Sequence, residues 1–365
     1  RFRLHTNCTA CAFRSVCRGT RAALHILALC STLQTDGLHT PIMRQWQAAC
    51  QRLVGPCVAL LVPILINGLF VQNCNWWIGF RWFLLIVVCS GVVSSGFGIV
   101  CSTTSRHPRT TFLILWLATI SVGFARFLWT PQVDIFNLFA GYFPGALYDE
   151  VLAEEVRIFW SRCEDLSITW VLLALAAGFK RQIRPRTVCF SLLALMLFVM
   201  QAHRVDLRRS SQHVQTRLGG IKNTEHFTVY YPKVWSDDRI EQLGVELEFL
   251  YQELVDQLGV TPGERLKIYF YNSMNQKKRL MGARNTRIAK PWQNAFHVDA
   301  PFIGASVIRH ELIHLFAAQF GAPPLGIAQN QYGLPNMALT EGLAEAYSPR
   351  DARLSLHEWS AAIDR

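Results

Sequence analysis

The sequence predicts an α-helical membrane bundle of about five spans followed by an α+β domain. Long apolar runs with few charges fill residues 53–203, and apolar residues make up 51% of the whole chain. Residues 204–365 instead mix apolar and charged side chains between turn residues, as a globular domain does. A third observation is the pattern His-Glu-x-x-His at residues 310–314, inside a predicted helix.

Residues 1–52 are interpreted as an N-terminal extension. The chain does not begin with methionine, and one interpretation places the native start at Met43, the first methionine. Cys8, Cys11 and Cys17 lack a fourth ligand at a standard spacing, so we predict no metal site in the extension.

Five apolar runs predict the membrane spans, because most of them approach the length needed to cross a hydrocarbon core. The fourth run is the weakest, since it is short and follows Glu164 and Asp165. The runs cover residues 53–71, 82–101, 111–129, 166–179 and 187–203. We therefore expect a multi-pass protein of the cell membrane, with the lipid bilayer as one partner.

Basic side chains in the short connections predict the orientation, because such residues stay on the cytoplasmic side. The three basic clusters fall on one side of five spans: Arg44 and Arg52; Arg106 and Arg109; and Lys180, Arg181, Arg184 and Arg186. The opposite loop, 130–165, carries seven acidic residues. This loop and the domain 204–365 are therefore expected to be extracytoplasmic. The net charge of +11 then reflects orientation, and no basic stretch interleaved with aromatics suggests nucleic acid as a partner.

The domain that follows the spans alternates strand and helix patterns, with a small sheet expected to pack on helices. Ser236 and Ser273 are expected helix caps, and Gly259 is expected to end the first helix. The expected elements are strands at 227–231, 266–271 and 295–298, and helices at 236–258, 273–281, 305–320 and from about residue 337. No cysteine follows Cys189, so metal ligands here must be histidine and carboxylate.

The motif helix carries the candidate chemistry. His310 and His314 are four residues apart, so they lie on one helical face and can bind one zinc ion together. Glu311 lies about 100° around the helix, where it can reach a water on that metal without being a ligand itself. The flanking residues are mostly apolar, which predicts a buried helix with little other use for these polar side chains.

A catalytic zinc site needs a third protein ligand, expected from a different segment. Glu341 and Glu345 share one face of the predicted final helix and supply the candidates. Between them, Gly342 is expected to let the two helices approach closely. The alternative interpretation is a solvated acidic helix face.

These residues resemble a known family. The helix 310–314 followed by Glu341-Gly342-Leu343-Ala344 resembles the gluzincin metallopeptidases of the peptidase MA clan. The second motif is similar to that of membrane alanyl aminopeptidases, with leucine in place of phenylalanine. The resemblance covers about residues 295–347 and implies a zincin-like domain with Glu341 as the third ligand of one zinc ion. The wider layout resembles bacterial multi-pass membrane proteins that carry a peptidase MA-like domain.

The resemblance also implies roles for neighbouring residues. Phe296, His297 and Val298 fall where gluzincins keep the edge strand that pairs with substrate backbone. For His297 the alternative is an ordinary strand residue that faces solvent. Glu345 is expected to accept a hydrogen bond from a ligand histidine and fix its tautomer. Glu311 is expected to act as the general base when water attacks the carbonyl of a peptide or protein substrate.

Two other functions compete with a peptidase. One is an inactive zinc-binding receptor or assembly module on a membrane anchor, because no tyrosine or histidine can be assigned as an oxyanion donor before the chain ends at Arg365. The other is a transporter-like protein in which the motif is coincidental. Against the transporter, the predicted spans hold no paired ionisable residues, and Arg126 stands nearly alone. The substrate and the oligomeric state do not follow from the sequence.

Overall fold

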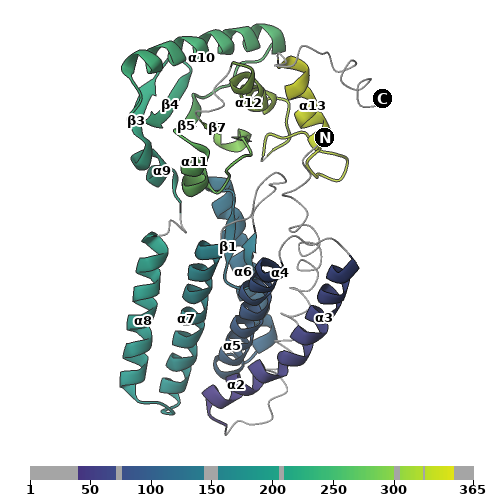
Figure 1. The fold of residues 1–365 in the computed structure, drawn as a ribbon, viewed down its shortest axis with the longest axis vertical. Helices are drawn as coiled ribbons and strands as arrows, with labels where there is room; N and C mark the ends of the chain where they lie inside the picture. The colour runs from purple at the N-terminus through teal and green to yellow at the C-terminus, as the bar shows by residue number, and fades with distance from the viewer. Residues whose placement is uncertain are drawn as a thin grey trace. The chain divides into compact units, whose positions relative to one another are not determined.

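The computed structural model describes residues 40–70, 76–143, 155–204, 209–299, 305–323 and 325–348. These residues form two compact units (Figure 1). The first unit runs to Phe127 and continues over Gln132–Arg208, and the second comprises Leu128–Pro131 and the chain from Arg209 onward. The predictions for most of the N-terminal extension, for part of the loop 130–165 and for the C-terminal end lie outside the described residues.

The first unit is a set of helices with one small hairpin (Figure 1). A π-helical turn, η1, continues α4 into α5, so that these three segments form one long helix. The elements are α2 (Ile42–Arg52), α3 (Val54–Phe70), α4 (Trp76–Trp82), η1 (Phe83–Val88), α5 (Cys89–Thr104), α6 (Pro108–Trp129), β1 (Ile135–Asn137), β2 (Gly141–Phe143), α7 (Glu155–Phe179) and α8 (Pro185–Arg204).

Three helical segments of the described chain are long and apolar enough to cross a membrane: Ile42–Gly68, Trp76–Thr104 and Pro108–Trp129. They coincide with the first three predicted runs. The predicted count of about five is not supported. α7 occupies the fourth run but starts at Glu155 and carries charges along its first half, and the apolar part of α8 is the shorter Pro185–Gln201.

Ionisable side chains pair inside the first unit, among residues 134–165, which lie outside the predicted spans. Arg157 Nη1 lies 2.8 Å from Asp134 Oδ2, and Arg162 Nη2 lies 2.5 Å from Asp165 Oδ2. Arg162 also donates to the carbonyl of Asn137 at 2.7 Å. Asp134 immediately precedes strand β1, and Asn137 is its last residue. Their bonds to Arg157 and Arg162 therefore hold the hairpin against α7. The apolar pattern alone did not reveal them, because the acidic partners lie in a segment predicted to be a loop.

The second unit contains every strand and helix that the sequence predicts, with boundaries within a few residues. The Ser273 side chain caps its helix by accepting from Gln276 N, and Gly259 ends α10 with a left-handed φ of 66°. Ser236 stands at the N-cap of α10 without a side-chain cap bond. The elements are α9 (Ser211–Leu218), β3 (Gly219–Asn223), β4 (Phe227–Pro232), α10 (Asp237–Leu258), β5 (Leu266–Tyr271), α11 (Met274–Met281), β6 (Ile288–Lys290), η2 (Pro291–Gln293), β7 (Ala295–Asp299), α12 (Ala305–Ala317) and α13 (Met337–Tyr347).

The sheet of this unit is mixed, with strand order β3-β4-β5-β7-β6. The three central strands β4, β5 and β7 run parallel, and β3 and β6 pair antiparallel at the two edges. Helices α10 and α11 lie in the connections between parallel strands, as such crossovers require. The region is therefore α/β with a mixed sheet, and the predicted α+β class is wrong because the central strands pair in parallel.

The two faces of the sheet have different chemistry, because successive side chains point to opposite sides. Ile268, Phe270 and Phe296 lie on one face, in a core shared with α10 and α12. Tyr269 and His297 lie on the other face, where their rings stack at 4.5 Å. The motif helix α12 thus packs against the apolar face of the sheet.

Candidate metal centre

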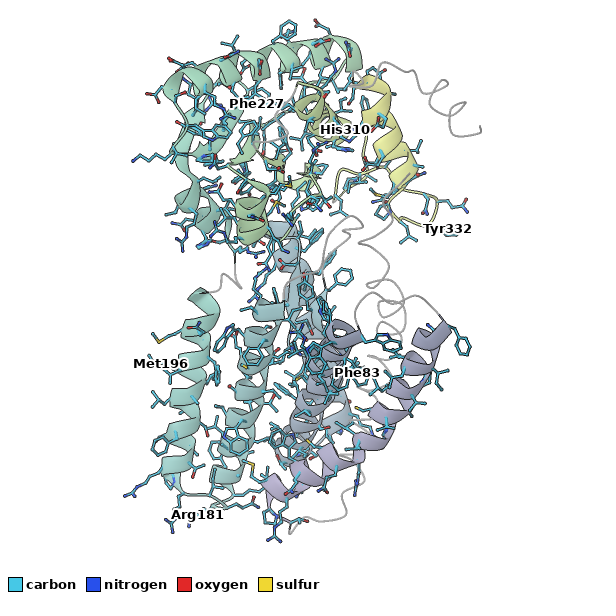
Figure 2. The ribbon with its side chains drawn as sticks, in the orientation of Figure 1. Phe83, Arg181, Met196, Phe227, His310 and Tyr332 are labelled. Atoms are coloured by element: carbon cyan, nitrogen blue, oxygen red, sulfur yellow. The ribbon has the colours of Figure 1, made fainter. Side chains whose placement is uncertain are left out.

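The motif helix α12 is buried on its apolar side, as the sequence predicts. Ile308, Leu312 and Phe316 are each fully buried in the core of the unit. That packing leaves the opposite side of α12 for the histidines. The His310 side chain remains partly exposed, and it lies between α12 and α13 (Figure 2).

Three ligand atoms from α12 and α13 come together. His310 Nε2 lies 3.3 Å from His314 Nε2. Glu341 Oε2 lies 3.5 Å from His310 Nε2 and 3.6 Å from His314 Nε2. Ligands about 2.0–2.1 Å from a tetrahedral zinc ion lie roughly 3.3–3.4 Å from one another. The three atoms therefore form a triangle of the size that one zinc ion needs, with the donor set that the sequence predicts.

Helix α13 is placed by its start and by a small contact surface. The Asn336 side chain caps it by accepting from Leu339 N. Ala344 is buried against the core, and Leu343 packs partly against it. The predicted role of Gly342 is wrong: a Cβ there would have nothing within 4 Å, so the glycine does not allow a close helix approach. The close approach comes from Ala344, because it is the residue that turns toward α12.

Burial and mutual contact shift the pKa values of the three candidate ligands. Contact with Glu341 raises the pKa of His310, and the same contact with His310 lowers the pKa of Glu341. Burial lowers the pKa of His314. Burial thus favours the neutral form of His314, and contact with Glu341 favours the protonated form of His310. A cation placed between them would displace that proton and satisfy both groups.

Glu311 lies beside the three ligands and is almost fully buried. Burial raises the pKa of its carboxyl to about 7, and the charge of His310 is the largest opposing influence. The nearby charges of Arg287 and Lys277 also lower that pKa, while Glu341 raises it. A carboxyl that exchanges its proton near neutral pH suits a general base.

Glu345 lies on the expected side of α13 but does not make the expected hydrogen bond. Its Oε1 is 3.7 Å from His310 Nδ1, which is close enough for ionic attraction but too long for a hydrogen bond. The side chain is also more than half exposed. Glu345 therefore lies near His310 Nδ1 without fixing it.

The predicted substrate strand is in the interior of the sheet. Phe296 and His297 in β7 pair with β5 on one side and with β6 on the other, so they offer substrate no open edge. Val298 lies in the buried core. His297 does not face solvent either, since it is fully buried and its Nδ1 lies 2.9 Å from Tyr271 Oη. The edge strand on this side is β6, which at three residues is too short for its pattern to be recognised in the sequence.

Several buried charged residues around the centre were not predicted. Arg309 bonds to two other helices, and Lys277 on α11 pairs with Asp299 at the end of β7. Both Lys277 and Asp299 are essentially inaccessible to solvent. For Arg309 a sequence signal exists, namely a charge inside an apolar helix. For the Lys277–Asp299 pair the sequence offers none, because the partners are remote and belong to unrelated patterns.

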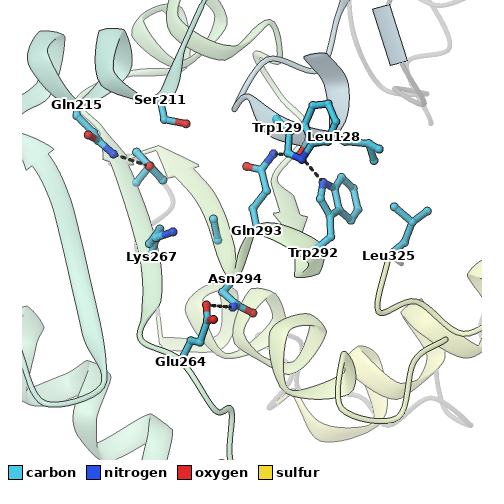
Figure 3. Close-up of a pocket in the computed structure, with 12 residues that line it drawn as sticks. Leu128, Trp129, Ser211, Gln215, Glu264, Lys267, Trp292, Gln293, Asn294 and Leu325 are labelled. Carbon is cyan, nitrogen blue, oxygen red and sulfur yellow. Dashed lines mark hydrogen bonds between the residues drawn. The ribbon is translucent and has the colours of Figure 1, made fainter. Parts of the chain in front are cut away.

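A pocket of about 470 Å³ opens on the other face of the sheet, within the second unit (Figure 3). Lys267 and Tyr269 line it from the sheet, and Trp292 and Asn294 from the turn before β7. Trp292 Nε1 donates to the carbonyl of Leu128 at 2.9 Å (Figure 3). None of the three candidate ligands lines this pocket, so we assign it no part in the candidate metal centre.

No family model, curated protein or solved structure matches the chain. The resemblance to gluzincins therefore depends on the motif residues and their geometry.

Proposed function

We propose that this protein is a membrane-anchored, zinc-dependent peptidase. The observation that supports the proposal best is the triangle formed by His310 Nε2, His314 Nε2 and Glu341 Oε2, with sides of 3.3, 3.5 and 3.6 Å. Two imidazoles and a carboxylate are the donor set of a hydrolytic zinc site that keeps a fourth position open. The buried carboxyl of Glu311 next to this triangle favours catalysis over a purely structural metal site.

The residues have distinct tasks in peptide hydrolysis. Zinc, when bound, would polarise the scissile carbonyl and acidify a water molecule. Glu311 accepts the proton of the attacking water and delivers it to the leaving amine. Its surroundings suit both steps, because burial favours the protonated form while His310 favours the ionised form. Glu345 adds negative charge near His310, which makes that imidazole a better donor to a cation.

The substrate backbone is expected to lie along the sheet edge nearest the motif helix. Strand β6 forms this edge, and it runs antiparallel to β7. An extended peptide can add to such an edge by main-chain hydrogen bonds, which accept many sequences. This arrangement moves the predicted substrate contact from Phe296, His297 and Val298 to the neighbouring strand.

We also propose that the catalytic domain is extracytoplasmic. In the five-span topology, α7 and α8 cross the bilayer in addition to the three long apolar segments. The exposed apolar side chains of α8 suit lipid, for example Phe190 and Met196. With three spans or five, the number of crossings is odd, so the domain ends on the side opposite the N-terminus. With five spans, all three basic clusters lie on the side of the N-terminus, which supports a cytoplasmic N-terminus.

A second candidate function is that of an inactive zinc-binding receptor or assembly module. It is favoured by the lack of an assigned oxyanion donor. Tyr332 is 77% exposed on its loop, and Tyr347 lies at the far end of α13, six residues beyond the ligand Glu341. Neither is assigned as the donor. His357, the other candidate, lies outside the described residues.

The decisive experiment compares Glu311→Gln with the wild-type chain, both purified at full length in detergent. Zinc content is measured by elemental analysis, and cleavage by a peptide library. We expect one zinc ion per chain in both proteins. Cleavage should fall at least about 100-fold in the variant, because the general base is lost. Equal cleavage by both proteins would refute the peptidase mechanism. Zinc without cleavage in the wild type would favour the receptor.

A further inference from the structure

The arginine that precedes the motif contacts three helices. Arg309 lies on α12 and is 5% exposed. Its Nε donates to the carbonyl of Tyr347, the last residue of α13, at 2.7 Å. Its Nη1 donates to Glu253 Oε2 at 2.5 Å and its Nη2 to Gln257 Oε1 at 2.7 Å, both on α10. The planar side chain of Arg309 thus joins its own helix α12 to both α13 and α10.

The hydrogen bond from Arg309 to α13 is made at the C-terminal end of that helix, where a positively charged donor is most favourable. The last carbonyls of a helix have no partner within it and carry the negative end of the helix dipole. A guanidinium group supplies both a donor and a positive charge to Tyr347 O. Glu253 balances the charge of the arginine, so its burial leaves no uncompensated ion.

Among the described residues, α13 buries little apolar surface, and Leu343 packs only partly against the core. Ala344 is its buried residue, and the Glu341 side chain is 42% exposed. A helix with so small an apolar contact can slide or tilt on its neighbour. A shift of 1 Å at Glu341 would spoil the ligand triangle, because zinc–ligand distances tolerate only about 0.2 Å.

We propose that Arg309 is a positioning residue that fixes α13 and thereby sets the place of Glu341 relative to the two histidines. This inference depends on the proposed zinc centre. Arg309 touches neither metal nor substrate. It acts through the backbone of α13, which no substitution at Tyr347 itself can remove.

The test measures zinc affinity of the full-length protein in detergent, by competition with a chromophoric chelator. Arg309→Lys keeps the charge but lacks the planar fork of donors that reaches acceptors on two helices. We expect zinc affinity to fall about 10- to 100-fold, as for other residues that orient ligands. The same substitution in a Glu341→Gln background should change the affinity less than about twofold, because the ligand that Arg309 positions is already absent.

Leu243→Ala is the matched control. Leu243 is buried in the same core, on α10 ten residues before Glu253, and the variant loses stability without touching α13. It should bind zinc as the wild type does. If Arg309→Lys does not fold, the double variant Glu253→Ala/Gln257→Ala replaces it, since it removes both acceptors of the guanidinium on α10. Zinc affinity should fall in that variant too.

The outcomes separate the two proposals. Wild-type affinity in folded Arg309→Lys, or an equal loss in both backgrounds, would overturn the positioning role alone. A wild-type chain that binds no zinc, or binds it equally after His310→Ala, would overturn the proposed metal centre and the positioning role with it.

Discussion

Residues at the candidate centre owe their properties to burial. The Glu311 carboxyl is ionised in water at neutral pH, but the apolar side of α12 places it out of solvent and raises its pKa to about 7. His314, four residues from the other histidine ligand, is more deeply buried than His310, and its pKa is lowered. Burial thus favours the uncharged form of both Glu311 and His314.

The buried pair of Lys277 and Asp299 gives a prediction at the same scale. Lys277→Met leaves Asp299 as an unpaired charge in the interior, so we expect the free energy of unfolding to fall by about 3–5 kcal/mol. Chemical denaturation followed by tryptophan fluorescence measures the change. The double variant Lys277→Met/Asp299→Leu should recover part of the loss, because no charge then remains buried. A single variant as stable as the wild type would show that the pair is not buried.

The elements of the second unit follow from local patterns, and their pairing does not. Helix α10 has apolar residues at helical spacing, and α13 starts at an asparagine cap where the sequence predicts a helix. Strand β6 is only three residues long and becomes a strand because β7 pairs with it. The order of strands in the sheet depends on these long-range contacts, so the edge was assigned to the wrong strand.

Two glycines predict opposite responses at the scale of the element. Gly342 lies in α13 with open space around its Cβ position, so Gly342→Ala should stabilise the helix by about 0.5–1 kcal/mol. Gly321 is the matched contrast, because a Cβ there would lie 2.2 Å from the carbonyl carbon of Gly326. Thermal unfolding should shift upward for Gly342→Ala and downward for Gly321→Ala. A loss of stability or of zinc affinity in Gly342→Ala would instead support the prediction that Gly342 lets α12 and α13 approach closely.

For the whole molecule, the apolar pattern predicts the positions of the three long apolar helices correctly, but the number of spans that it predicts is not supported. The three long segments contain few charges, and their outward side chains are apolar, for example Ile66 in α3 and Leu117 in α6. Helix α7 differs, because Arg157 and Arg162 are paired in its first half with acidic side chains. Pairing allows charges in a helix whose sequence, taken alone, is too polar for a span.

The proposed orientation can be tested on intact membranes. Thr261 is exposed in the connection between α10 and β5, and the second unit has no cysteine in its sequence. In right-side-out vesicles, Thr261→Cys should react with a membrane-impermeant maleimide, and the parent chain reports the background from the earlier cysteines. Labelling that requires permeabilised vesicles would place the domain in the cytoplasm.

The sequence by itself determined the types of the candidate ligands and the helix that carries two of them, because a spacing of four residues dictates one helical face. It also determined the three long apolar segments, since length and lack of charge suffice for them. Only the tertiary structure decided that Glu341 comes within 3.6 Å of both histidines. It alone decided that Arg309 joins three helices and that β6 forms the sheet edge. These features depend on contacts between residues far apart in the chain, and no local pattern encodes such contacts.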